Sequence, residues 1–161
     1  MSAIVREYKP DDLEDMIKIW NEVVKSADAF PQTDFLSIKS AEDFFKNQSF
    51  TGVAQINNEI AGLYILHPNN IGRCSHIANA SYAVKSNARG KGIGETLVRH
   101  SLKKAKELDF KILQFNAVVK TNQAAIKLYK KLGFISLGTI PEGFQKADGK
   151  YEDIILFYHT L

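Results

Sequence analysis

Cysteine is almost absent from this sequence, with Cys74 the only one among 161 residues. An internal disulfide is therefore excluded. Long apolar runs are also missing: no stretch approaches the roughly 20 residues that a membrane-spanning helix needs, and no basic-then-apolar leader precedes Ile4. These absences predict a cytoplasmic protein that does not enter a membrane.

A strong charge of either sign is absent too. The 21 basic and 18 acidic residues leave a net charge of +3, an excess too small to indicate nucleic-acid binding. The histidines have no metal-ligand spacing, and Cys74 with His76 supplies too few ligands for a zinc site. We therefore expect no nucleic-acid partner and no bound metal.

The remaining composition is that of an ordinary folded domain. Hydrophobic residues make up 45% and charged residues 24% of the chain. The length suits one domain, residues 1–161, and no repeat or linker divides it. We therefore treat the whole chain as one folding unit.

The pattern of apolar residues predicts a mixed α/β fold. Helices are expected to begin at Asp11, as a capping box with Glu14, at Ser40, after Gly94 and at Asn122. Strand-like segments lie at residues 2–8, 51–56, 60–67, 75–84, 111–118, 134–139 and 151–159. The order is a strand, helices, an antiparallel run, and then two strand–helix units before the last strands.

A glycine-rich turn at residues 84–94 separates a predicted strand from a predicted helix. A helix N-terminus has unpaired backbone N–H groups that attract phosphate, and glycine lets an anion approach the backbone. Arg89 and Lys91 add positive charge. The glycine spacing fits neither the P-loop nor the dinucleotide-binding fingerprint. A pyrophosphate site is therefore predicted, with a tight turn that binds no ligand as the alternative.

A second motif spans residues 122–134. Asn122 and Tyr129 are separated by nearly two helical turns, about 10 Å along the axis, and therefore share a face. The small side chain of Ala125 lies between them and leaves space for a ligand. The alternative for Tyr129 is an ordinary core tyrosine of an amphipathic helix.

In this order, the two motifs resemble the GNAT superfamily of N-acetyltransferases. The resemblance implies one α/β (α+β) domain, with a mixed, mostly antiparallel sheet of about seven strands flanked by about four helices. It also implies acetyl-CoA as co-substrate, with pantetheine at the end of the strand at Val84 and pyrophosphate at the glycine turn. Ser86 departs from the family, which often has proline there. The implied cofactor-binding residues are Tyr82, Val84, Arg89, Gly90, Lys91, Gly92, Ile93, Gly94, Glu95, Asn122, Ala125 and Tyr129.

The same resemblance implies a catalytic role for Tyr129, whose hydroxyl would protonate the departing thiolate. A backbone N–H near Val84 would polarise the thioester carbonyl. The acceptor amine must lose its proton before attack, but no residue stands out as the base. The candidates are Tyr82, Glu142, Asp148 and Asp153.

A narrower resemblance lies in residues 67–80 and in Phe115-Asn116. These segments are similar to the branch that includes yeast N-acetyltransferases of proline analogues such as azetidine-2-carboxylate, and they imply substrate contacts from Asn79 and Asn116. Asparagine is also a poor strand residue, and a buried amide needs partners, which a small amino acid would supply. The alternative is that backbone groups at a strand bulge satisfy both amides.

The predicted function is acetyl transfer to the amine of a small molecule, an amino acid or an analogue. The alternatives are a protein or peptide N-acetyltransferase and a CoA-binding domain without turnover. Residues 140–150 are expected either to close over the acceptor or to form a plain hairpin connection. A homodimer through exposed late strands is implied by the family resemblance alone.

Overall fold

The computed structural model describes residues 2–161, which form one mixed sheet with helices on both faces. The strands and helices are β1 (Ile4–Glu7), α1 (Leu13–Ser26), α2 (Ile38–Lys46), β2 (Phe50–Ile56), β3 (Glu59–Pro68), β4 (Ile77–Val84), α3 (Ile93–Glu107), β5 (Ile112–Val119), α4 (Gln123–Lys131), β6 (Ile135–Gln145) and β7 (Tyr151–Thr160). Short 3-10 turns η1 (Pro10–Asp12), η2 (Gly72–Cys74) and η3 (Ser86–Ala88) connect some of them. No helix among these residues is long and apolar enough to cross a membrane.

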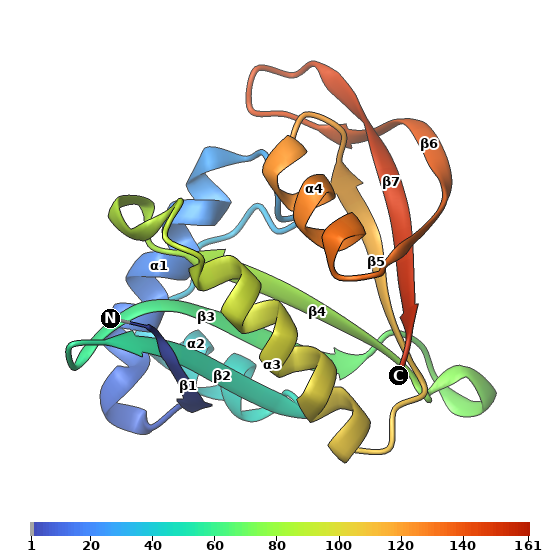
Figure 1. Ribbon diagram of the computed structural model, residues 1–161. Coiled ribbons are helices and arrows are strands. Elements are labelled where there is room, and N and C mark those ends of the chain that lie inside the picture. The colour runs from blue at the N-terminus through green and yellow to red at the C-terminus, as the bar shows by residue number, and fades with distance from the viewer. Residues whose placement is uncertain (1) are drawn as a thin grey trace.

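The seven strands have the order β1-β2-β3-β4-β5-β7-β6. All neighbours are antiparallel except β4 and β5, which run parallel. The predicted mixed, mostly antiparallel sheet with four flanking α-helices is therefore confirmed. Figure 1 shows β4 and β5 close together at one end and far apart at the other.

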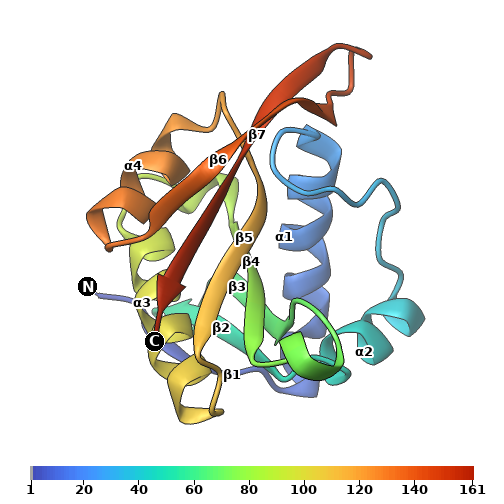
Figure 2. The same ribbon diagram turned by 90° about the vertical axis from the view of Figure 1, so that its right-hand side faces the viewer.

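Helices α1 and α2 cover one face of the sheet, and α3 and α4 cover the other (Figure 2). Each face has its own apolar core, as expected for amphipathic helices on a sheet. The α1 side is built around Trp20, whose ring centroid lies 4.4 Å from that of Phe30. The α3 side buries Tyr64 and Leu97 completely.

Two predicted helix starts were wrong by one to three residues. Asp12, not Asp11, accepts the Lys9 N–H at 2.7 Å, and a short 3-10 turn precedes α1. Ser37, not Ser40, caps α2, while Ser40 donates its own backbone N–H to the Ser37 hydroxyl at 3.1 Å. At α2 the two serines form a reciprocal capping box, whereas the side chain of Asp12, the N-cap residue of α1, makes no cap hydrogen bond to that helix.

β4 and β5 are paired over only a short stretch and then separate. Parallel pairing is confined to Ile77 with Ile112 and Ala78 with Leu113. Past these pairs β5 bulges between Phe115 and Val118, where its pairing with β7 is interrupted. The C-terminal ends of β4 and β5 therefore diverge and leave space between them.

The segment at residues 140–150 forms a hairpin with β7, rather than an insertion after a strand ending at Thr139. β6 continues to Gln145 and pairs again with β7 at Phe144 and Gln145 after an irregularity. The prediction ended the strand too early because Pro141 and Gly143 are turn residues in sequence. A bulge on an edge strand accommodates both.

The first prediction concerns the Arg6–Asp12 ion pair, which joins β1 to the start of α1. Arg6 donates two hydrogen bonds to the Asp12 carboxylate, at 2.7 and 2.9 Å. These bonds lower the pKa of Asp12, which is 8% exposed. We expect Asp12→Asn to reduce the free energy of unfolding by about 1–3 kcal/mol at neutral pH, measured by urea denaturation.

Because the folded-state pKa lies below the unfolded value of about 3.9, this stabilisation is complete at neutral pH and disappears as the pH falls through the folded pKa. The unfolding curves of wild type and Asp12→Asn should therefore converge in acid. Asp15→Asn, an exposed change in the same helix, is the control. Equal stabilities of wild type and Asp12→Asn at pH 7 would contradict the assignment.

Candidate functional site

A cavity of about 740 Å³ lies at the C-terminal end of β4, where the glycine turn and the first turns of α3 and α4 meet. It brings together every predicted cofactor-binding residue except Lys91, whose side chain is exposed outside it. Its predicted lining residues are Tyr82, Val84, Arg89, Gly90, Gly92, Ile93, Gly94, Glu95, Asn122, Ala125 and Tyr129. Two motifs separated in sequence therefore face one space.

The glycine turn forms one end of this cavity because its backbone needs left-handed conformations. Gly90 has φ +74° and Gly92 has φ +79°, and Gly92 directly precedes the first residue of α3. The first-turn N–H groups of a helix have no intrahelical acceptor and carry partial positive charge. This end of the cavity therefore suits a polyanion such as a pyrophosphate.

Glu95 places a carboxylate in the first turn of α3, but cations from two helices offset its charge. Arg99 donates to it at 2.8 Å and Lys131 at 2.7 Å. The hydrogen bonds from Lys131 and Arg99 lower the pKa of Glu95. The network is exposed and joins α3 to α4 across the cavity edge.

The opposite wall belongs to α4. Asn122 is its N-cap, and the side-chain oxygen accepts the Ala125 N–H at 3.3 Å. The Asn122 side-chain NH₂ group remains able to donate to a ligand. Gly133, with φ +90°, follows the end of α4 as the predicted stop residue.

Tyr129 is fixed by aromatic packing. Its ring centroid lies 4.4 Å from that of Phe115 and 5.5 Å from that of Phe134. Burial raises the pKa of Tyr129 above the ordinary value. Among residues 2–161 no side chain or backbone group hydrogen-bonds the Tyr129 hydroxyl, which leaves it available as a proton donor to a ligand.

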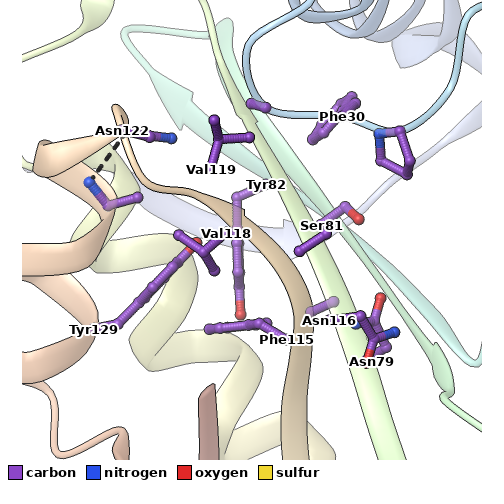
Figure 3. A pocket seen from close by; sticks show the side chains of 15 residues that line it. Phe30, Asn79, Ser81, Tyr82, Phe115, Asn116, Val118, Val119, Asn122 and Tyr129 are labelled. Carbon is purple, nitrogen blue, oxygen red and sulfur yellow. Dashed lines mark hydrogen bonds between the residues drawn. The ribbon is translucent and has the colours of Figure 1, made fainter. Parts of the chain in front are cut away.

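A second, smaller cavity of about 160 Å³ adjoins the first. Both cavities are lined by Ala29, Tyr82, Asn122, Ala125 and Tyr129. The smaller one also reaches Asn79 and Asn116, as predicted (Figure 3). Figure 3 shows Phe30, on the loop after α1, across this space from Tyr129.

The two asparagines do not have the environment that the sequence argument assumed. Asn116 is exposed and Asn79 only partly buried, so burial does not force either amide to find a ligand. Asn79 donates to the Gln114 backbone carbonyl at 2.9 Å, which is the backbone alternative. Asn116 donates to the Asn69 side chain at 2.6 Å. Both still line the cavity.

Of the four candidate bases, Tyr82 alone lines the two cavities. The Tyr82 hydroxyl is hydrogen-bonded to Ser101 at 2.7 Å, and burial raises the pKa of Tyr82 well above its ordinary value. Glu142, Asp148 and Asp153 line neither cavity. Asp153 instead accepts the Glu142 N–H at 3.0 Å. Within residues 2–161 no His, Cys, Asp and Glu cluster has the arrangement of a metal site.

Sequence reasoning missed the loop after α1. Ala29, Phe30 and Pro31 line the smaller cavity. Their segment has no periodicity or motif, and only its path over the sheet places it at the site. Phe30 and Phe35 are both aromatic residues in this loop, and only the structure shows that Phe30 is buried, at 6% exposed, and Phe35 is not.

Comparison with known proteins assigns the chain to a family. The model of the acetyltransferase (GNAT) family matches residues 12–134, which contain both motifs. This chain therefore belongs to the GNAT family of acetyltransferases. It carries an acetyl-CoA-dependent N-acetyltransferase domain.

Individual relatives agree with this assignment. The chain is 37% identical to the N-acetyltransferase aca1 of Schizosaccharomyces pombe over 62% of this chain and 49% of that protein. It thus matches about half the length of that relative. It is 26% identical to Bacillus subtilis YwnH, provisionally named a phosphinothricin acetyltransferase, over 93% of this chain and 94% of YwnH. A GCN5-related N-acetyltransferase from Kribbella flavida superposes with a TM-score of 0.91 at 30% identity, covering 99% of this chain and 98% of that structure.

The second prediction tests Tyr129 as the proton donor. Tyr129→Phe keeps the ring between Phe115 and Phe134 but removes the hydroxyl. We expect kcat to fall about 100-fold, the lower range for loss of a general acid, with acetyl-CoA affinity nearly unchanged. An assay of thiol release measures kcat, and isothermal titration calorimetry measures the affinity for acetyl-CoA.

Tyr151→Phe, an exposed change on β7, is the matched control and should keep full activity. Because the raised pKa keeps Tyr129 protonated, kcat should show no loss from tyrosine ionisation below about pH 10. An unchanged kcat in Tyr129→Phe would remove this residue from the chemistry.

Proposed function

We propose that this protein transfers the acetyl group of acetyl-CoA directly to the amine of a small molecule, an amino acid or an amino-acid analogue. The observation that carries the proposal is the junction of the two cavities at Tyr129. A ligand with a phosphate-bearing end suits the larger cavity, and a small acceptor suits the smaller one. The reacting groups would then meet beside the Tyr129 hydroxyl.

The residues of the larger cavity fit acetyl-CoA. The α3 N-terminus and Arg89 would hold the pyrophosphate, while Val84 and Asn122 would contact the pantetheine arm. β4 has no strand partner on its β5 side beyond Ala78 within the described residues, so backbone groups up to Val84 face the gap. Bound acetyl-CoA would supply the acetyl thioester.

The lining of the smaller cavity favours a small acceptor. A volume of about 160 Å³ has room for a group the size of one amino acid. Its polar side chains are the amides of Asn79, Asn116 and Asn122, the Ser81 hydroxyl and the two tyrosines. The name of YwnH points in the same direction, since phosphinothricin is an amino-acid analogue.

Within this assignment each residue has one task. Asn79 and Asn116 would orient the acceptor, and the first-turn N–H groups of α3 would bind phosphate oxygens. Tyr129 would donate its proton to the departing thiolate sulfur. Because no carboxylate lines the smaller cavity, the acceptor proton would leave through water.

The experiment that tests the function measures acetyl-CoA-dependent thiol release over a panel of acceptors. The panel contains azetidine-2-carboxylate and other proline analogues, the standard amino acids, methionine sulfoximine, polyamines and short peptides. A strong signal with one amino or imino acid supports the proposal. A signal with peptides alone would make the protein a peptide N-acetyltransferase, and acetyl-CoA binding without turnover would make it a binding domain.

The third prediction separates the two cavities by mutation. We expect Arg89→Ala to raise the KM for acetyl-CoA several-fold with little effect on the acceptor KM, because a charged hydrogen bond to phosphate is lost. Asn79→Ala should instead raise the acceptor KM several-fold with little effect on the KM for acetyl-CoA. Steady-state kinetics with each substrate varied in turn distinguishes these outcomes.

Lys91→Ala is the control for the first variant, because Lys91 is a neighbouring cation that lines neither cavity. If Arg89→Ala and Lys91→Ala change the KM for acetyl-CoA equally, the effect is one of overall charge and the placement of the pyrophosphate is wrong.

We also propose that two copies pair through β6. This strand forms one edge of the sheet, and Ile135, Leu137 and Ile140 on it are 55%, 55% and 48% exposed. Exposed apolar side chains on an edge strand favour association. Sedimentation velocity tests this: Leu137→Lys should convert a dimer to a monomer, and a monomeric wild type would refute the pairing.

A further inference from the structure

Two consecutive side chains of α1, Asn21 and Glu22, reach two different loops of the site. Asn21 contacts the loop at residues 27–37, and Glu22 contacts the turn that follows β4. Figure 1 shows this turn beside α1. Neither residue lines either cavity, so any effect on catalysis would act through the loops.

Asn21 makes a paired contact with one residue of the loop. Its side-chain NH₂ donates to the Leu36 carbonyl at 3.0 Å, and its side-chain oxygen accepts the Leu36 N–H at 2.8 Å. Between residues 28 and 36 no backbone–backbone hydrogen bond holds the described chain. The loop therefore depends on Asn21 at one end and on the packing of Phe30 against Trp20 at the other.

This loop supplies one wall of the smaller cavity through Ala29, Phe30 and Pro31. A segment without backbone hydrogen bonds loses its position easily when a side-chain anchor is removed. The Asn21–Leu36 pair is therefore suited to fixing the wall that faces the acceptor.

Glu22 holds the other loop. Its carboxylate accepts the Ser86 N–H at 3.1 Å at the start of η3, the turn that leads into Arg89 and Gly90. Hydrogen bonding to Ser86 lowers the pKa of Glu22, and Arg89 and Lys85 lower it further, so the carboxylate is ionised at neutral pH. A fixed negative charge beside the turn also limits the positions that Arg89 samples.

We propose that Asn21 and Glu22 are positioning residues for separate substrates: Asn21 sets the acceptor wall and Glu22 sets the pyrophosphate turn. One helix, α1, thus positions the two loops that line the smaller and the larger cavity. This inference rests on the proposed assignment of the larger cavity to acetyl-CoA and of the smaller one to the acceptor.

The fourth prediction is that the two variants affect different substrates. We expect Glu22→Ala to raise the KM for acetyl-CoA about tenfold and to leave the acceptor KM within about twofold, with Asn21→Ala showing the reverse. The kcat of both should change less than that of Tyr129→Phe. The acceptor is the panel compound with the highest kcat/KM, and calorimetry measures acetyl-CoA affinity independently of turnover.

Three comparisons control for general destabilisation. Glu22→Gln keeps a hydrogen-bond acceptor for Ser86 and should recover most of the acetyl-CoA affinity. Glu14→Ala removes an exposed carboxylate from the same helix, paired with Lys18 alone, and should behave as wild type. Hydrogen exchange should accelerate at the Leu36 amide in Asn21→Ala and at the Ser86 amide in Glu22→Ala, whether or not an acceptor is found.

Parallel rises in both KM values for both variants, or no change in either variant, would overturn the inference. Its failure is distinguishable from failure of the site assignment. If Arg89→Ala weakens acetyl-CoA binding while Glu22→Ala does not, the site stands and the positioning role is wrong. If Arg89→Ala also leaves binding unchanged, the placement of acetyl-CoA itself is wrong.

Discussion

The structure depends on the short parallel pairing of β4 with β5. Two residue pairs hold these strands together, and the bulge in β5 then turns them apart. A sheet that continued to pair would satisfy the backbone of β4 internally and leave no opening. Because pairing stops, the smaller cavity forms between the strands, lined by residues of both. The ends of β4 and β5 lead directly into the two loops that start α3 and α4, and the larger cavity lies among these loops and helices. The fold creates a cleft by interrupting one ladder while keeping every other strand pair antiparallel.

A series of aromatic side chains lies beside this opening. Tyr64, Tyr82, Phe115 and Tyr129 lie on neighbouring strands and on α4, and their rings contact one another in series. Tyr82 uses its hydroxyl for Ser101, whereas Tyr129 keeps its hydroxyl free of protein partners within residues 2–161. Both tyrosines line the cavities, and burial raises the pKa of both. They differ in the hydroxyl partner alone, since only the Tyr129 hydroxyl is left for a ligand.

Two loops complete the site, and side chains of α1 contact both of them. The segment at residues 28–36 has no backbone–backbone hydrogen bonds, and the turn after β4, which has backbone hydrogen bonds of its own, is joined to α1 by the bond from Ser86 to Glu22. α1 packs against the sheet through Trp20 and its neighbours, so its outer side chains are well placed to hold both. Such an arrangement lets the loop at residues 28–36 vary in sequence while the sheet and the glycine turn remain unchanged.

The sequence by itself determined the local features. The order of elements, the glycine turn and the Asn122–Tyr129 motif were all predictable, because backbone conformation, helix periodicity and phosphate affinity depend on neighbours within one or two turns. The tertiary structure decided the rest. How exposed Asn116 is, and that Phe30 and Pro31 line the same cavity as Tyr129, depend on contacts between distant segments. Candidate bases were named from residue type alone, whereas proximity to the cavity, which excludes Glu142, Asp148 and Asp153 from its walls, is a property of the folded chain.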